Sequence, residues 1–426
     1  MAFLRTHLAP VVFCAQVASS FFDTGLQMVV KQRYENATRA RSGAGGQHHQ
    51  KSIADFYMIF NILVKVVPII PAFLLARIGD KGYRKVPVVV PLTGYLVSRG
   101  LLLFVIVFDL RVEVMYAAPV VNGLCGGFSS YWPGVITLVS LSTSEELRSL
   151  RIMRTELTYG LAGFLGSLAS GHLYQLHGLG HRQGVVLASV SALLYLLCLL
   201  YAACILQINT RAPDERRDSE NVGILKLNLN SDTANIAFLF AAGILYDVAV
   251  GGGVEILNVY VLGQPLNWTA AQVGYGNAAG SVIFITSFFG VKLFTRCSMS
   301  DTSMIMIGII SFLSGIYFMT FVTSTTTYFL ARTLTLFALI PMPTIRSLLS
   351  KQIRGSSYGK TFTVLQLSFQ LVGLATTPIF TKIYQSTLHI LPGFVFTLSS
   401  IIAFLAVIPI SIVGCRLARQ EHYERF

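Results

Sequence analysis

Charged side chains are scarce in this sequence. Asp, Glu, Lys and Arg make up 12% of its 426 residues, whereas 54% are hydrophobic, and the mean hydropathy is +0.64. A soluble globular domain carries about 25% charged residues. The low charge therefore argues against an ordinary soluble fold and indicates that lipid surrounds most of the chain.

Several motifs that mark enzymes and pumps are also absent. The sequence has no G-x-x-x-x-G-K-[ST] phosphate loop, no Cys and His cluster at metal-ligand spacing, and no nucleophile elbow. We therefore predict a protein that is not an enzyme, has no cofactor or metal site, and does not use a nucleotide as its energy source.

Acidic residues are fewer than basic ones, 19 against 32, and the net charge is +13. A basic chain can be a nucleic-acid binder. If residues 79–85 are cytoplasmic, however, strict alternation of loops places about two thirds of the Lys and Arg on the cytoplasmic side, as the positive-inside rule predicts. We therefore expect no nucleic-acid partner.

Cysteine is sparse too, with six residues in the chain. All six fall in apolar runs or at their cytoplasmic ends. We therefore expect no extracellular disulfide.

Long apolar runs are what the sequence contains instead. A helix needs about 20 apolar residues to cross a bilayer core, and twelve runs of roughly that length follow one another. They are 8–30, 53–78, 86–108, 114–140, 155–176, 183–206, 234–262, 272–295, 302–322, 326–350, 360–384 and 390–415. We predict an all-α membrane protein with twelve transmembrane helices and both termini in the cytoplasm.

A polar linker divides these runs into two groups of six. We expect an N-terminal six-helix bundle over 1–206, a cytoplasmic linker over 207–233, and a C-terminal bundle over 234–426 that ends in a short cytoplasmic tail. Two pseudo-symmetric halves are typical of transporters in which a central site lies between two rocking bundles.

Two N-glycosylation motifs fall on the predicted outer face. Asn36 lies in the first outer loop, expected over 31–52, and Asn267 lies in the loop before the eighth span. Asn267 is close to the predicted membrane surface, which leaves its modification open.

The connector between the second and third spans is short and charged. It reads Gly79-Asp80-Lys81-Gly82-Tyr83-Arg84-Lys85. Gly79 and Gly82 permit a tight turn, and Asp80 can pair with a neighbouring base or a helix end. A plain basic turn on the cytoplasmic side is the alternative. The pattern G-D-x-G-x-R-K resembles the loop signature of the major facilitator superfamily, whose fold we therefore expect.

Polar side chains recur at helical spacing in spans one, four, seven and ten. The four sets are Gln16, Ser20, Asp23 and Gln27; Asn122, Gly126, Ser129 and Pro133; Asp247, Gly251, Glu255 and Asn258; and Arg332, Thr335, Leu339, Pro343 and Arg346. In the facilitator fold these spans line the central cavity. The Gly and Ser positions favour close helix packing, whereas charges inside a span favour a cavity.

Basic residues inside the spans predict the charge of the substrate. Lys65, Arg99, Arg332 and Arg346 would make a cationic interior. Because Arg grips carboxylates and phosphates in bidentate fashion, we predict a small anionic organic substrate. The alternative is that each base is held in a structural ion pair, such as Lys65 with Asp23.

Two titratable groups in the fifth span are candidates for proton coupling. Glu156 shares a stripe with Gly160, Gly163 and Ser167, so it lies on a closely packed face where lost hydration favours the neutral carboxyl. A salt bridge to Arg151 or Arg154 is the alternative for Glu156. His172 lies farther along the span, where a hydrogen-bonded packing role is the alternative.

Several segments resemble the solute carrier 46 family. They are Arg148-Ser-Leu-Arg151-Ile-Met-Arg-Thr-Glu156, Leu262-Gly-Gln-Pro265-Leu-Asn-Trp268 and Pro343-Thr-Ile-Arg346-Ser-Leu-Leu-Ser-Lys351. The resemblance runs nearly end to end. It implies a proton-coupled importer at the cell surface. An acidic endolysosomal membrane would suit such an importer as well, so the sequence leaves its residence open.

The same resemblance implies substrates and residue roles. The substrates are diaminopimelate-type muropeptides, with cyclic dinucleotides and antifolates as further candidates, delivered toward cytosolic innate immune sensors. Glu156 matches the proton-coupling carboxylate of the family, and Arg346 matches a substrate-pocket arginine of its folate transporter. Val250 and Gly127 replace a functional histidine and aspartate of that transporter, which argues against folate as the main substrate.

Two functions remain open on the sequence. The leading hypothesis is a secondary transporter that works by alternating access, in which the proton is the coupling ion. The alternative is a membrane receptor or scaffold that binds the ligand on the same fold without moving it.

Overall fold

The computed structural model describes residues 8–41, 47–141, 145–176, 184–206, 229–352 and 358–424, and these ranges are helical with no strand. In chain order the helices are α1 (Ala9–Arg41), α2 (Gln47–Val66), α3 (Ile69–Asp80), α4 (Val86–Val107), the 3-10 helix η2 (Val112–Tyr116), α5 (Ala117–Leu124), α6 (Gly127–Leu141), α7 (Glu145–Leu176), α8 (Val185–Leu200), the π-helix η4 (Tyr201–Ile205), α9 (Leu229–Tyr260), α10 (Ala270–Arg296), α11 (Asp301–Met319), α12 (Thr325–Leu334), α13 (Pro341–Gln352), α14 (Tyr358–Thr387) and α15 (Phe394–Glu424).

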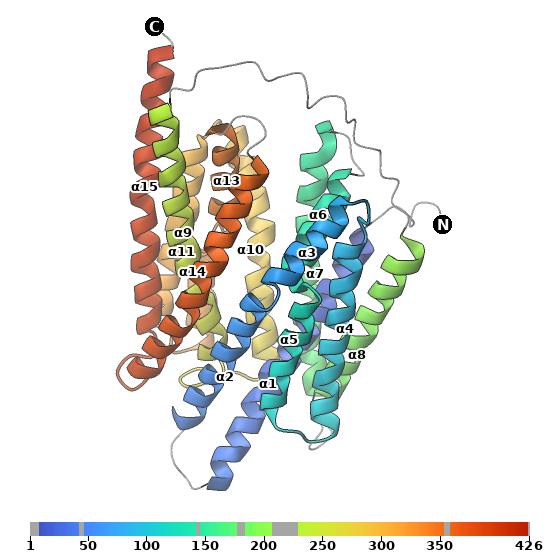
Figure 1. Ribbon diagram of the computed structural model, residues 1–426. Coiled ribbons are helices and arrows are strands. Elements are labelled where there is room, and N and C mark those ends of the chain that lie inside the picture. The colour runs from blue at the N-terminus through green and yellow to red at the C-terminus, as the bar shows by residue number, and fades with distance from the viewer. Residues whose placement is uncertain are drawn as a thin grey trace.

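The helices form two groups that lie side by side (Figure 1). Helices α1–α8 make one group and α9–α15 make the other; within the first group, α2 lies against the second. The groups meet mainly where α7 packs on α10 and where α2 packs on α14. We call the end at which α1 begins and α15 ends the terminal end, and the opposite end the distal end.

Each of the twelve predicted spans is occupied by helix. In the described ranges, seven helices are long and apolar enough to cross a membrane by length and composition. Three predicted spans are broken in two, namely those that contain α2 and α3, α5 and α6, and α12 and α13.

Proline and glycine account for the first two breaks. Pro68 lacks a backbone N–H and stands between α2 and α3. Gly126 and Gly127 have φ of +90° and +50°, a left-handed conformation that favours glycine; Gly126 stands between α5 and α6, and Gly127 begins α6. Pro68 also packs on Gly127, 3.5 Å from where a Cβ would lie, so the two breaks are in contact.

Side-chain hydroxyls satisfy the backbone at the third break, between α12 and α13. Ser311 Oγ on α11 donates to Leu334 O at 2.5 Å and accepts from Phe337 N at 3.1 Å. Thr286 Oγ1 on α10 donates to Leu336 O at 2.6 Å. Broken helices are tolerated at membrane depth when neighbours satisfy the freed backbone groups.

The first outer loop is shorter than predicted. The expected loop 31–52 was wrong, because α1 continues to Arg41 and α2 already begins at Gln47. Lys31 and Glu35 form an i,i+4 ion pair at 3.9 Å, and the ring of Tyr34 packs edge-on against Phe56, which stabilises the added turns. Asn36 therefore lies exposed on a helix.

The linker prediction falls largely outside the described residues. Helix α9 begins at Leu229, and residues 207–228 are not described. The boundaries of the two bundles therefore stay a prediction. All six cysteines are free.

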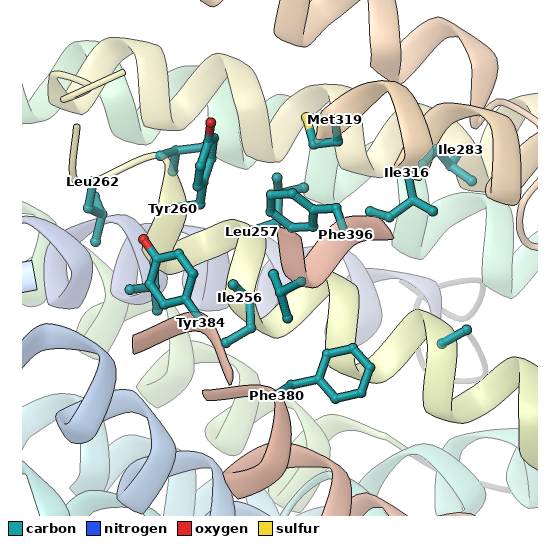
Figure 2. Packing of buried hydrophobic residues seen from close by; sticks show 14 of the residues in the cluster. Ile256, Leu257, Tyr260, Leu262, Ile283, Ile316, Met319, Phe380, Tyr384 and Phe396 are labelled. Carbon is teal, nitrogen blue, oxygen red and sulfur yellow. The ribbon is translucent and has the colours of Figure 1, made fainter. Parts of the chain in front are cut away.

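The core of the second group fixes the position of α9. Leu257 and Tyr260 of α9 pack beside Phe396 of α15 (Figure 2), with the two rings edge-on at 5.2 Å. Tyr260 also donates from its hydroxyl to Val322 O at 2.6 Å. Close packing of this kind restricts side-chain and backbone freedom, so α9 presents its polar face to the first group in a fixed register.

Candidate functional site

A cavity of about 370 Å³ lies between the two groups of helices. Helices α1, α2 and α7 line it on one side, and α9, α10 and α12 line it on the other. Its charged lining residues are Asp23, Glu255 and Arg332, and its polar ones include Gln16, Ser20, Gln27, Asn61, Asn258 and Asn277. The whole polar stripe predicted on the first span therefore faces this central cavity.

Arg332 is the basic residue of the central cavity. Its Nε atom is buried and has no hydrogen-bond partner in the described part of the protein. Its guanidinium lies against Gly280, where an added Cβ would be 2.8 Å from Nη2. The guanidinium also lines the cavity, where its positive charge can attract an anion.

A second cavity of about 220 Å³ adjoins the first, and Glu255 lines both. In it, Lys65 Nζ donates to Glu255 Oε1 at 2.5 Å and to Thr377 Oγ1 at 2.7 Å. Lys65 thus pairs with Glu255 and not with Asp23, the partner that the sequence suggested. Since Lys65 lies on α2 and Glu255 on α9, this ion pair bridges the two groups.

Three further charges extend this bridge. Arg346 on α13 attracts both Glu156 on α7 and Asp247 on α9, and Asp247 is also attracted by Lys65. Glu156 is therefore opposite an arginine of the other group. The suggested alternative partner Arg151 has a side chain outside the described residues.

The break between α12 and α13 changes the geometry predicted for the tenth span. A single helical face from Arg332 to Arg346 was wrong, because the chain leaves the helix after Leu334 and re-enters it at Pro341. Arg332 lines the central cavity, while Arg346 belongs to the charge network at the terminal side.

Arg99 lies apart from both cavities. It is 7% exposed, and its guanidinium carbon is 3.8 Å from the ring centre of Phe22 and 4.9 Å from that of Tyr95. It attracts Asp23 across this aromatic layer. Its position is that of a cation that stabilises the first group behind the cavity wall.

His172 also lies outside the cavities. Its Nε2 is 2.9 Å from the hydroxyl of Tyr275 on α10. Close by, α7 and α10 approach through glycines, since a Cβ on Gly274 would lie 2.6 Å from Ser167 O. The histidine therefore takes part in the contact between the two groups.

The charged loop lies beside a third cavity of about 240 Å³, lined by Gly79, Arg84, Ser129 and Pro133 among others. Gly82 has φ of +104°, as a glycine turn requires. Lys85 donates to Leu206 O. The side chain of Asp80, and with it the predicted pairing, lies outside the described residues.

The stripe predicted on the fourth span does not reach the central cavity. Ser129 and Pro133 line the third cavity, and Asn122 packs against Gly94. The break at Gly126 turns this face away.

Hydrogen bonds join the two groups at the distal end. Lys31 Nζ donates to Trp268 O at 3.0 Å, and Gln50 Nε2 donates to the hydroxyl of Tyr384 at 2.5 Å. Lys382 Nζ and Asp55 Oδ1 form an ion pair at 3.0 Å. Glu156 and Arg346, toward the terminal end, are both exposed although they face each other. Solvent thus reaches the network from the terminal end.

Sequence reasoning missed part of the lining. Asn277, Gly280 and Ser281 on α10 line the central cavity, and their i, i+3, i+4 spacing could have revealed them. Asn267 lies exposed in the turn before α10 with φ of +45°. No local signal pairs Gln50 with Tyr384, which are 334 residues apart.

Comparisons with known proteins bear on this geometry. Residues 12–377 match the family model described as Major Facilitator Superfamily. The chain is 42% identical to solute carrier family 46 member 2 of the dog (Canis lupus familiaris), over 99% of this chain and 95% of that protein. It is 28% identical to the human lysosomal proton-coupled steroid conjugate and bile acid symporter SLC46A3, over 88% of this chain and 83% of that one. The crystal structure of the POT family transporter PepTSo is similar in fold, with a TM-score of 0.66 at 11% identity over 97% of this chain and 98% of that one.

Proposed function

The chain is a membrane transporter of solute carrier family 46 in the major facilitator superfamily, and on that premise we propose that it imports an anionic organic solute together with protons. Diaminopimelate-type muropeptides are the first candidate substrates, followed by cyclic dinucleotides and antifolates. Their delivery to the cytosol would serve innate immune sensing.

The observation that carries this proposal is the composition of the charge network. Lys65 and Arg346 supply two positive charges, while Glu156, Asp247 and Glu255 supply three negative ones. With all five ionised, an entering anion adds to a negative excess. Because like charges close together repel each other, a proton that neutralises a carboxyl favours binding of the anion.

The arrangement supports alternating access. We take the terminal end as cytoplasmic, in agreement with the basic loop 79–85, and the distal end as facing the outside or the lumen. In this structure the distal end is closed by bonds between the groups. Breaking those bonds and closing the terminal end would expose the central cavity to the other side.

Residue roles follow from position. Arg332 and Arg346 would bind the negative groups of the solute, and Asp23 and Gln27 would contact its polar or positive parts in the central cavity. Glu156 would carry a coupling proton, because it faces Arg346 across the two groups and is reached by solvent.

The site of action is the cell membrane or an endolysosomal membrane. The human relative is named as a lysosomal, proton-coupled symporter. An acidified outside or lumen would supply the proton gradient in either place.

Uptake by cells that express the chain tests the proposal. The panel holds a muropeptide, a cyclic dinucleotide, an antifolate and an organic cation, each at acidic and neutral outside pH, with surface expression measured. We expect acid-stimulated accumulation of at least one anion and none of the cation, and loss of that accumulation in Glu156→Gln and Arg346→Ala. Saturable binding without accumulation would contradict it and favour a receptor.

A further inference from the structure

Lys65 is held entirely by groups of the opposite half of the molecule. A lysine ammonium has three N–H donors. Lys65 Nζ lies 2.5 Å from Glu255 Oε1, 2.7 Å from Thr377 Oγ1 and 3.3 Å from Gly373 O. The cation comes from α2, whereas all three acceptors come from α9 and α14.

Glu255 is equally committed to this contact. Its second oxygen, Oε2, accepts from Thr377 Oγ1 at 2.8 Å. The side chains of Lys65 and Glu255 are 25% and 21% exposed. They are shielded enough for their pairing to matter, yet they remain open to the cavity. Glu255 also lines both cavities, so it stands where a solute would meet Lys65.

The charges around Glu255 come from several helices. They are Lys65 on α2, Asp247 on α9, Asp23 on α1, Arg332 on α12 and, beside Asp247, Arg346 on α13; the phenol of Tyr57 on α2 also lines the central cavity. Lys65 is the base in direct contact with Glu255. Loss of the negative charge of Glu255 therefore acts first on Lys65.

The position of Lys65 couples this contact to the shape of α2. Lys65 lies in the last turn of α2, directly before the break at Pro68. That break packs on Gly123, where an added Cβ would be 2.7 Å from Val67 Cβ. A change of the binding partner of Lys65 therefore acts directly beside the break between α2 and α3.

We propose that Glu255 and the substrate anion bind the ammonium of Lys65 in turn, and that a proton on Glu255 makes the exchange. In the empty site Lys65 and Glu255 neutralise each other. When a proton from solvent adds to the Glu255 carboxylate, the ion pair becomes an ammonium beside a neutral carboxyl. A carboxylate or phosphate of the solute then takes the place of Glu255 at Lys65. The sum of charges is zero before and after, so one proton and one anionic group enter together.

This inference rests on the proposed function and assigns it a second proton group besides Glu156. It also explains why the base here is a lysine. An ammonium is a compact charge that can exchange single partners, whereas an arginine fork favours one bidentate partner.

The test compares Glu255→Gln with the wild type in transport of the anion identified by uptake. Glutamine imitates the protonated carboxyl. We expect the acid stimulation of its uptake to be smaller than in the wild type, because only Glu156 remains to be protonated, its accumulation against a gradient to fall, and its anion counterflow to persist. A merely structural role would lower uptake, accumulation and counterflow together. Lys292→Met, at an exposed lysine on α10, is the matched control and should behave as the wild type.

Lys65→Met gives a second reading if Glu255→Gln does not reach the membrane. With no ammonium to exchange, KM for the anion should rise about tenfold or more at both pH values. Lys65→Arg should restore part of the affinity.

The outcomes separate the two proposals. The exchange at Lys65 is overturned if the wild type shows acid-stimulated uptake and Glu255→Gln shows the same stimulation. It is also overturned if Lys65→Met keeps the KM of the wild type. Either result leaves the proposed function intact. A wild type that accumulates no anion at either pH overturns the proposed function and this inference with it.

Discussion

Among single residues, Arg332 and Arg99 show how two arginines inside the spans take different roles. Both have an Nε with no hydrogen-bond partner in the described part of the protein, but Arg332 lines the central cavity, whereas Arg99 is enclosed by the rings of Phe22, Tyr95 and Tyr195. The first is placed to bind a solute and the second to stabilise the first group of helices. Substitution should separate these roles.

Arg332→Ala should raise KM for the transported anion by about 10- to 100-fold, because a hydrogen bond to a charged group contributes about 1.5–3 kcal/mol. The KM of Arg332→Lys should lie between those of the wild type and Arg332→Ala, because lysine keeps the positive charge but cannot bind an anion in bidentate fashion. The KM values come from initial uptake rates measured over a range of anion concentrations and scaled to surface expression. An unchanged KM in Arg332→Ala would remove Arg332 from the binding site.

Arg99→Met should act on stability. Loss of a desolvated cation–π contact of about 2 kcal/mol should lower the unfolding temperature of purified protein by about 2 °C. Its KM should change far less than that of Arg332→Ala. A KM change as large as that of Arg332→Ala, with unfolding temperature unaltered, would show that Arg99 reaches the solute.

The charged residues inside the spans could be found from the sequence, but the residues with which they form ion pairs could not. The cost of a charge inside a span identified Lys65, Asp247 and Glu255 as special. Lys65 and Glu255 are 190 residues apart, and no periodicity relates them. The sequence therefore suggested Asp23 for Lys65, and the packing of α2 on α9 and α14 decided otherwise.

The positions of the helices could be predicted from the sequence, whereas the breaks within them could be predicted only in part. The apolar runs located a helix at every predicted span, because the bilayer sets the length of a helix. Periodicity then assumed unbroken helices, which is why the faces predicted for spans four and ten were wrong. The break at Gly126 has a glycine signal, whereas the break after Leu334 depends on hydroxyls of α10 and α11 that only the fold brings near.

The contact of α7 with α10 makes a prediction about Gly274. A Cβ there would lie 2.6 Å from Ser167 O and 3.0 Å from Gly171 Cα, and backbone atoms cannot move aside. Gly274→Ala should therefore push the helices apart near the distal end and favour a state open on that side. Gly100→Ala is the control, because nothing lies within 4 Å of its added Cβ.

A cysteine in the central cavity reports the change. With Asn61→Cys as the probe, a membrane-impermeant thiol reagent added outside should label Gly274→Ala faster than its parent, and Gly100→Ala no faster. Equal labelling of all three would mean that the glycine contact does not control opening.

Over the whole molecule, the distal bonds decide which side of the cavity is closed. The pair Asp55 and Lys382 is well exposed, with side chains 47% and 61% accessible. Exposed pairs contribute about 0.2–1 kcal/mol. The bond between Gln50 and Tyr384 is buried, and a buried group left unsatisfied costs about 1–3 kcal/mol.

Gln50→Ala should therefore shift the protein toward the outward-open state by about 5-fold or more, and Asp55→Ala by less than about 5-fold. Labelling of the same Asn61→Cys probe gives both values. The reverse order would show that the exposed ion pair holds the distal end closed.

Proton movement driven by the anion tests the central claim most directly. Purified protein in sealed vesicles, with equal pH on both sides and a pH-sensitive dye inside, would receive the anion from outside while its uptake is followed in parallel. Coupled import predicts that the interior acidifies as the anion enters, and that Glu156→Gln reduces the acidification per anion. Entry of the anion at full rate with no change of internal pH would contradict proton coupling.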